Sequence, residues 1–172
     1  MARDWNEHFL DAGNLDFAPE PLLVLASGLL PAGKALDLAC GAGRNALYLA
    51  GLGWRVTAVD RSPAALARLR ERAALSASID IHQADLERGE FPILPDSFDL
   101  ICDILYLQRG LFDAIRHGIR PGGVFAGVLL LAEPGRDSAF RIDSGELRQE
   151  FAEWKILYYS EAGEARILAR KA

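Results

Sequence analysis

Short apolar runs alternate with segments of helical character along most of this chain, and that alternation constrains the fold more than any other feature. Runs with strand character occupy residues 35–39, 54–60, 78–85, 98–103 and 124–131. Segments of helical period occupy residues 44–52, 63–75 and 108–119. Strands that alternate with helices in this way are typical of a parallel sheet wrapped by helices. The sequence therefore predicts an α/β fold with a doubly wound, mostly parallel, Rossmann-like sheet.

The two ends of the chain depart from this alternation. Residues 154–159 and 165–170 flank a turn that contains Gly163, which predicts an antiparallel hairpin that completes a seven-stranded sheet. Residues 5–10 and 21–30 have the character of two short helices ahead of the first strand. We therefore expect a single domain over residues 1–172, with residues 1–33 as a helical extension or lid and residues 34–172 as the core.

Composition excludes several classes of protein. The 172 residues are 51% hydrophobic, and 19 Lys and Arg against 24 Asp and Glu give a net charge of −5. An acidic chain without a cluster of cations disfavours nucleic-acid binding, which needs Lys and Arg gathered on one face. The longest apolar stretch, residues 124–132, is about half of the roughly 20 residues that a membrane helix requires.

The cysteines and the amino terminus bear on the cellular compartment. Cys40 and Cys102 are the two cysteines, without Cys-x-x-Cys or His/Cys clustering, so we expect no metal site and no disulfide. The first residues carry acids where a signal peptide needs a basic start and an apolar core. These features favour a cytoplasmic protein, a monomer or homodimer with no nucleic-acid or membrane partner.

A glycine-rich turn follows the first predicted strand. Gly41 and Gly43 lack the Cβ atoms that would keep a ligand away from the backbone, and the turn leads into a helix with free N–H groups. Asp60 ends the second predicted strand, seventeen residues after Gly43. An acid at this place can accept hydrogen bonds from the 2′ and 3′ hydroxyls of an adenosine ribose. The alternative is that Asp60 is a solvated aspartate beside Arg61.

Three further acids fall on predicted strands near the same edge. Asp37 lies on the first strand, and Asp85 and Asp103 end the third and fourth strands. Asp85, with the Leu86 backbone beside it, can accept a hydrogen bond from an exocyclic adenine amine, or it is simply exposed. Because like charges gathered at one edge repel one another, the arrangement predicts a ligand that carries positive charge.

Together these residues resemble the class I S-adenosylmethionine-dependent methyltransferases, over most of the chain from Ala35 onward. The stretch from Asp37 to Gly43 is similar to that family's acidic, glycine-rich first motif. Asp60 is similar to its ribose-binding acid and Asp85 to its adenine-contacting position.

Other segments extend the resemblance. Residues 98–101 are similar to the family's fourth-strand motif, and residues 120–123 to the turn before its fifth strand. Residues 41–49 are similar to small-molecule methyltransferases of the tellurite-resistance type. Ala39 departs from the pattern, because the family usually has glycine at that position.

The resemblance implies S-adenosylmethionine as cofactor, S-adenosylhomocysteine as product and in-line methyl transfer to a small molecule. It also implies roles for individual residues. Gly41 and Gly43 make room for the methionine part, Asp37 and Asp103 favour its ammonium group, and Arg44 meets its carboxylate. The expected cofactor-binding residues are Asp37, Ala39, Cys40, Gly41, Gly43, Arg44, Asp60, Arg61, Asp85, Leu86 and Asp103.

The acceptor side is less specified. The chain lacks the Asn/Asp-Pro-Pro-aromatic stretch of amino-directed nucleic-acid methyltransferases, which favours a small-molecule acceptor. Tyr106, just past the fourth predicted strand, is the main candidate to face the acceptor. Trp5 and Phe9 lie one helical turn apart and could close over the site, although such a pair can also simply dock a helix to the core.

Two alternative functions remain at this point. Gly41, Gly43 and Ala46 also satisfy the pattern Gly-x-Gly-x-x-Gly/Ala of NAD(P)-dependent oxidoreductases. Asp37 and the terminal hairpin argue against that class, since a dinucleotide site wants an apolar first strand and a second mononucleotide half. Ala39 and the missing acceptor motif leave room for a non-catalytic S-adenosylmethionine-binding or scaffold module.

Overall fold

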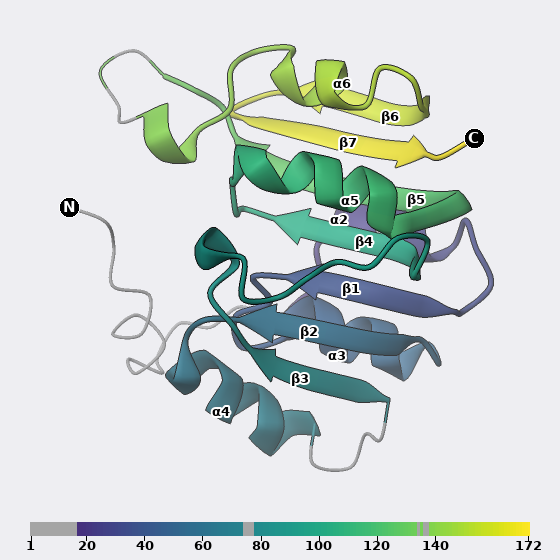
Figure 1. Cartoon of the computed structure of the whole chain (residues 1–172), viewed down its shortest axis with the longest axis vertical. Helices are drawn as coiled ribbons and strands as arrows, with labels where there is room; N and C mark the ends of the chain where they lie inside the picture. Colours follow the sequence, from purple (N-terminus) through teal and green to yellow (C-terminus); the bar gives the residue numbers. More distant parts are fainter. Residues whose placement is uncertain (1–16, 74–77, 134, 136–137) are drawn as a thin grey trace.

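The computed structural model describes residues 17–73, 78–133, 135 and 138–172, whose strands form one seven-stranded sheet (Figure 1). The strands are β1 (Lys34–Leu38), β2 (Arg55–Asp60), β3 (Ile79–Gln83), β4 (Phe98–Ile104), β5 (Ile119–Leu130), β6 (Lys155–Glu161) and β7 (Glu164–Arg170). Their order is β3-β2-β1-β4-β5-β7-β6. The first five strands pair in parallel, and β7 pairs antiparallel with both β5 and β6. The predicted fold class and terminal hairpin are confirmed.

Helices cover both faces of this sheet. The α-helices are α2 (Pro21–Ser27), α3 (Arg44–Gly51), α4 (Pro63–Ala73), α5 (Phe112–Gly118) and α6 (Glu146–Glu150). Short 3-10 turns are η2 (Leu86–Arg88), η3 (Arg109–Leu111) and η4 (Ser138–Phe140). Buried side chains of α2, α3 and α4 form one apolar cluster with the sheet, and those of α5 and α6 form another. The sheet is therefore doubly wound, as expected.

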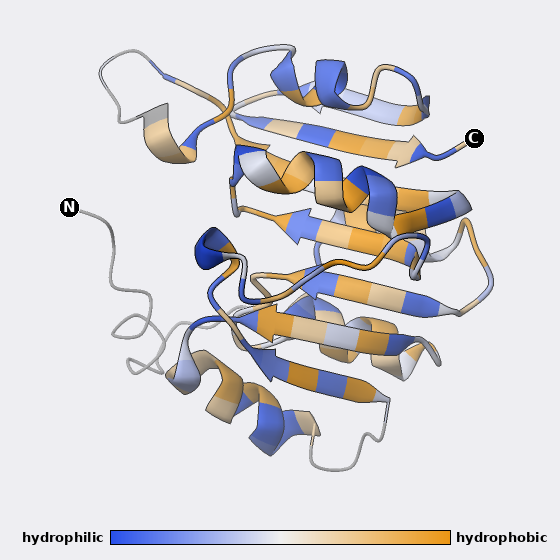
Figure 2. Cartoon of the chain, viewed as in Figure 1, coloured by the Kyte–Doolittle hydropathy of each residue, from blue (hydrophilic) through white to orange (hydrophobic). Residues whose placement is uncertain are grey.

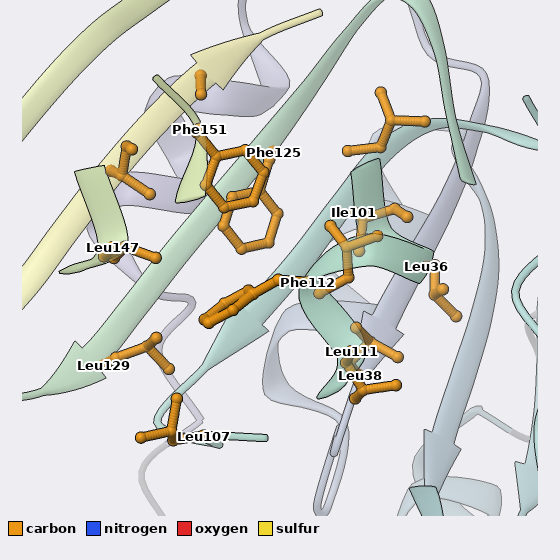
Figure 3. Packing of buried hydrophobic residues seen from close by; sticks show 14 of the residues in the cluster. Leu36, Leu38, Ile101, Leu107, Leu111, Phe112, Phe125, Leu129, Leu147 and Phe151 are labelled. Carbon is orange, nitrogen blue, oxygen red and sulfur yellow. The ribbon is translucent and has the colours of Figure 1, made fainter. Parts of the chain in front are cut away.

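Aromatic side chains build the core on the α5 and α6 face. The rings of Phe125 and Phe151 stack with centroids 4.4 Å apart, and Phe112 meets Phe151 edge-on at 6.2 Å. Figure 3 shows these three rings together, with Leu38 and Leu111 in the same cluster. Offset and edge-on aromatic contacts stabilise a core beyond the area that they bury. This cluster therefore supports the strands whose ends carry the site.

Two of the predicted elements differ most from those observed. The helix expected over residues 108–119 is divided into η3 and α5. β5 starts at Ile119 rather than at residue 124, because Ile119 pairs with Phe98 before the register with β4 shifts. The helix ends just before the predicted stop at residues 120–123, and β5 runs through that stretch with Gly122 in the left-handed region at φ 80°.

A partly buried ion pair docks α2 against the rest of the fold. The Glu20 carboxylate accepts a hydrogen bond from the Arg166 guanidinium on β7 at 2.6 Å. The Glu20 backbone amide donates to the Asn45 side chain in α3 at 2.9 Å. The described part of the expected helical extension is thereby tied to both the sheet and the first helix after the glycine turn.

Strained backbone follows two central strands. Ala39, directly after β1, has φ 49°, and Leu105, directly after β4, has φ 62°. This left-handed region brings the Cβ atom too close to the following carbonyl oxygen, so residues other than glycine rarely adopt it. Ala39 stands where the resembled family has glycine, and its φ supplies the physical reason for that preference.

Replacing Ala39 with glycine should raise the free energy of unfolding by about 0.5–1 kcal/mol, because the relief of strain exceeds the added entropy of the unfolded chain. Urea unfolding followed by circular dichroism measures the change. Ala50→Gly, the same substitution inside α3, is the matched control and should instead lower stability by about 1 kcal/mol. Equal effects at the two positions would contradict the assignment of strain to Ala39.

Candidate functional site

The glycine turn occupies the carboxyl edge of the sheet, between β1 and α3. The Cys40 amide donates to the Val59 carbonyl of β2, and the Gly43 amide closes the turn onto the Cys40 carbonyl, both at 2.9 Å. Gly41 and Gly43 have φ of 56° and 80°. A Cβ atom on Gly43 would lie 2.2 Å from the Leu69 side chain of α4. The turn therefore requires glycine for its backbone and, at Gly43, also for the packing of α4.

Asp60 joins this turn to the end of β2. One oxygen of its carboxylate accepts from the Gly41 amide and the other from the Ser62 amide, each at 2.8 Å. The side chain is 8% exposed, and burial raises the pKa of Asp60 although the two amides oppose that shift. Because a carboxylate can accept about four hydrogen bonds, each oxygen retains acceptor capacity. The predicted ribose acid is thus held rigidly at the rim of the turn.

Asp37 and Asp103 are buried on the neighbouring strands β1 and β4, and each is 1% exposed. The Cys102 thiol donates to one oxygen of Asp37 at 3.3 Å. Oδ2 of Asp37 and Oδ1 of Asp103 have no hydrogen-bond partner among the described residues. Burying an unpaired acceptor costs free energy, so two such atoms at the same sheet edge indicate that a donor or cation completes the site.

Burial also controls the charge of these acids. Desolvation raises the pKa of Asp37 to about 7, although the Cys102 thiol, the Ala46 amide and the charge of Arg44 lower it and Asp60 raises it. Desolvation raises the pKa of Asp103 as well, against a hydrogen bond from the Tyr106 backbone amide. A cationic group would favour the ionised form of both carboxyl groups.

Asp85 differs from the other three acids. Its carboxylate accepts from the Glu87 amide at 3.0 Å and lies 3.6 Å from Arg88, so it caps the η2 turn. The Ala84 amide before it donates to the Asp60 carbonyl at 3.1 Å, which places the two predicted cofactor acids at adjacent strand ends. The prediction of four acids at one edge is met in position, but Asp85 is partly exposed, whereas the other three acids are buried.

The remaining predicted residues have structural partners of their own. The Arg61 guanidinium lies 3.8 Å from the Glu87 carboxylate and thus connects the segments after β2 and β3. Leu86 is buried in the core. Cys40 and Cys102 are free, and burial raises the pKa of both thiols well above its usual range, so both remain protonated. In the described part of the chain, no three His, Cys, Asp or Glu side chains gather to hold a metal ion.

The structure describes only one of the three residues that the sequence predicts to face the acceptor. Tyr106 is half-buried after β4, and its hydroxyl donates to the Gln108 side chain at 2.8 Å. Trp5 and Phe9 lie outside the described residues. The sequence prediction missed Gln108 and Asn45, because a single amide side chain carries no pattern and gains its meaning from partners distant in the chain.

Comparison with known proteins decides the family. Residues 35–123, more than half of the chain, match the family described as "Methyltransferase domain". The chain belongs to this methyltransferase family. Hemagglutinin 1 of Eikenella corrodens is 32% identical to it over 154 residues, which cover 75% of this chain and 46% of that protein.

TehB of Haemophilus influenzae, named a probable S-adenosyl-L-methionine-dependent methyltransferase, is 27% identical over 81% of this chain and 52% of its own length. The crystal structure of TehB superposes with a TM-score of 0.82 at 23% identity, covering 98% of this chain and 67% of TehB. The chain spans about half the length of these curated relatives.

These matches confirm the predicted resemblance to class I S-adenosylmethionine-dependent methyltransferases of the tellurite-resistance type. The predicted enzyme class and the predicted cofactor, S-adenosylmethionine, agree with the description of the family and with the printed name of TehB. The buried unpaired acceptors of Asp37 and Asp103 and the acid at Asp60 fit that cofactor, which carries cationic groups and a ribose. Among the described helices, none is long and apolar enough to span a membrane.

The raised pKa of Asp37 predicts a particular pH dependence of stability. Between pH 4 and pH 7 the folded chain retains a proton that the unfolded chain releases, so stability falls as pH rises through this range. Asp37→Asn removes this contribution. We expect the wild-type free energy of unfolding to fall relative to that of Asp37→Asn by up to roughly 4 kcal/mol over the window.

Urea unfolding at a series of pH values measures that difference. Asp113→Asn, which removes a carboxylate that is 80% exposed and pairs with an arginine, is the matched control. A wild-type free energy of unfolding that stays constant or rises relative to that of Asp37→Asn, as the pH rises from 4 to 7, would contradict the burial of a protonated Asp37.

Proposed function

We propose that this chain transfers a methyl group from S-adenosylmethionine to a small-molecule acceptor and releases S-adenosylhomocysteine. One observation carries the proposal: two buried carboxyl groups with unpaired oxygens stand beside a glycine turn at the carboxyl edge of a parallel sheet. Ligands of open α/β sheets bind beyond this edge. A cofactor with an ammonium group and a sulfonium supplies positive charge that balances the negative charge of these acids.

We propose a binding role for each of the residues at this edge. Asp60 holds the ribose hydroxyls, for which it retains acceptor capacity. Asp37 and Asp103 favour the ammonium group, and the turn from Ala39 to Gly43 makes room for the methionine part. Arg44 meets the carboxylate, whereas Asp85 and Leu86, braced by the pair of Arg61 and Glu87, bound the adenine. A charge-assisted hydrogen bond of this kind contributes roughly 1.5–3 kcal/mol.

The catalytic contribution of the protein is mainly geometric. S-Adenosylmethionine supplies a methyl group on a positively charged sulfur, and a lone pair of the acceptor attacks that methyl group in line and displaces the sulfur. The residues at the sheet edge orient the partners and exclude water, and methyl transfer of this kind requires no obligatory catalytic side chain. Tyr106, Trp5 and Phe9 stay as candidates to face the acceptor. We further propose that residues 34–172 act as one core domain in the cytoplasm, without nucleic-acid or membrane partners.

A panel of ligands tests this proposal against the alternatives. S-Adenosylmethionine and S-adenosylhomocysteine should raise the melting temperature, since ligands that bind the native state stabilise it. NAD and NADP, tested at the same concentrations, should leave it unchanged. A shift with the nicotinamide cofactors alone would indicate an oxidoreductase. Failure to bind S-adenosylhomocysteine would overturn the proposal, and binding without transfer to any of a panel of small acceptors would favour the scaffold module.

Asp60→Ala should weaken the binding of S-adenosylhomocysteine at least tenfold, because it removes the acceptor assigned to the ribose and one anchor of the turn. Isothermal titration calorimetry measures the dissociation constant. Asp113→Ala, on the exposed side of α5, should retain wild-type affinity. An unchanged affinity in Asp60→Ala would exclude the ribose assignment.

A further inference from the structure

A chain of hydrogen bonds runs from the end of β4 to the turn after β3. The Tyr106 backbone amide donates to the Asp103 carboxylate, and the Tyr106 hydroxyl donates to Oε1 of Gln108 at 2.8 Å. Nε2 of Gln108 in turn donates to the Leu86 carbonyl at 3.1 Å. Asp103 and Leu86 stand at the two ends of this chain of contacts, and the proposed function assigns them to opposite ends of the cofactor.

The contact is notable because β3 and β4 are not neighbours in the sheet. β2 and β1 lie between them, and at about 4.8 Å per strand the separation is about 14 Å. The segment after β4 therefore reaches across the carboxyl ends of two strands. Leu107 and Leu111 support it by packing in the same apolar cluster as Leu38 and Leu86, and Figure 3 shows Leu111 beside Leu38.

The surroundings keep the Tyr106 hydroxyl protonated. Burial raises the pKa of Tyr106, the negative charges of Glu87, Asp103 and Asp85 raise it further, and Arg61 opposes them. The Leu86 carbonyl can only accept, so Nε2 of Gln108 faces it and donates. Oε1 of Gln108 therefore faces the protonated Tyr106 hydroxyl, which donates to it. The direction of the whole chain of bonds is therefore set by chemistry.

We propose that Gln108 is a positioning residue that, through Tyr106 and Leu86, holds the η2 turn against the adenine end of the cofactor site. The inference rests on the proposed function. Asp85 and Leu86 belong to one short turn, so fixing the Leu86 carbonyl also fixes the Asp85 carboxylate that is assigned to the exocyclic amine of adenine. Gln108 thereby tunes the recognition of the base without touching the cofactor.

The test compares two ligands that differ at that amine. S-Adenosylhomocysteine carries it, whereas S-inosylhomocysteine has an oxygen in its place. Wild type should bind the adenosyl compound more tightly by calorimetry. Gln108→Ala should weaken the binding of the adenosyl compound about tenfold, which is the effect of one lost hydrogen bond of ordinary strength. It should weaken the binding of the inosyl compound much less. The ratio of the two affinities, which measures the preference for adenine, should therefore fall in this variant.

Two further variants separate the bonds. Gln108→Glu keeps the acceptor for Tyr106 but loses the donor to Leu86, so it should behave like Gln108→Ala. Tyr106→Phe removes only the first bond and should have a smaller effect. Gln149→Ala, on the exposed face of α6, and Tyr158→Phe, which removes the exposed hydrogen bond to Ser160, should retain both affinities.

The outcomes are distinguishable. A collapse of the adenine preference in both Gln108 variants, with the control variants unchanged, supports the assignment. Wild-type affinities in Gln108→Ala, or an equal loss of affinity for both ligands, would overturn the positioning role while leaving the proposed function intact. Absence of S-adenosylhomocysteine binding by wild type itself would overturn the proposed function, and the positioning role with it.

Discussion

Burial of the central strands on both faces is the constraint on which the rest of this molecule depends. Four of the five residues of β1 are buried, as is the long apolar half of β5. A strand that is apolar on both sides must be covered on both sides, which the two groups of helices accomplish. Figure 2 shows the result in the central strands, which have mostly hydrophobic interiors and hydrophilic positions toward several of their ends. Chemistry is thereby confined to the ends of the strands.

This confinement also explains why acids are found inside the protein. Asp37 and Asp103 lie on the most deeply buried strands, so they cannot reach bulk water and they retain unpaired oxygens. The molecule tolerates that cost together with the left-handed backbone of Ala39 and Leu105 at the same edge. Buried unpaired groups and backbone strain both lower stability, and both persist where a ligand site needs them.

Much of the fold could be predicted because its signals are local. Strand and helix periods, the glycine turn and the hairpin around Gly163 each depend on residues close in sequence. The start of β5 was missed because it depends on the pairing of Ile119 with Phe98 across the sheet. The split of the helix expected at residues 108–119 was missed for a related reason, since the segment after β4 crosses the sheet before α5 begins.

The sequence by itself determined the order of strands and helices, the glycine turn and the choice of acids at the strand ends, because these follow from residue type and spacing. Only the tertiary structure decided which acids are alike: Asp37 and Asp103 are buried with free acceptors, Asp60 is bonded to the Gly41 amide, and Asp85 caps its own turn. It also decided the link from Gln108 to Leu86. Burial and long-range hydrogen bonds depend on which distant segments pack together, and the spacing of residues along the chain does not determine that.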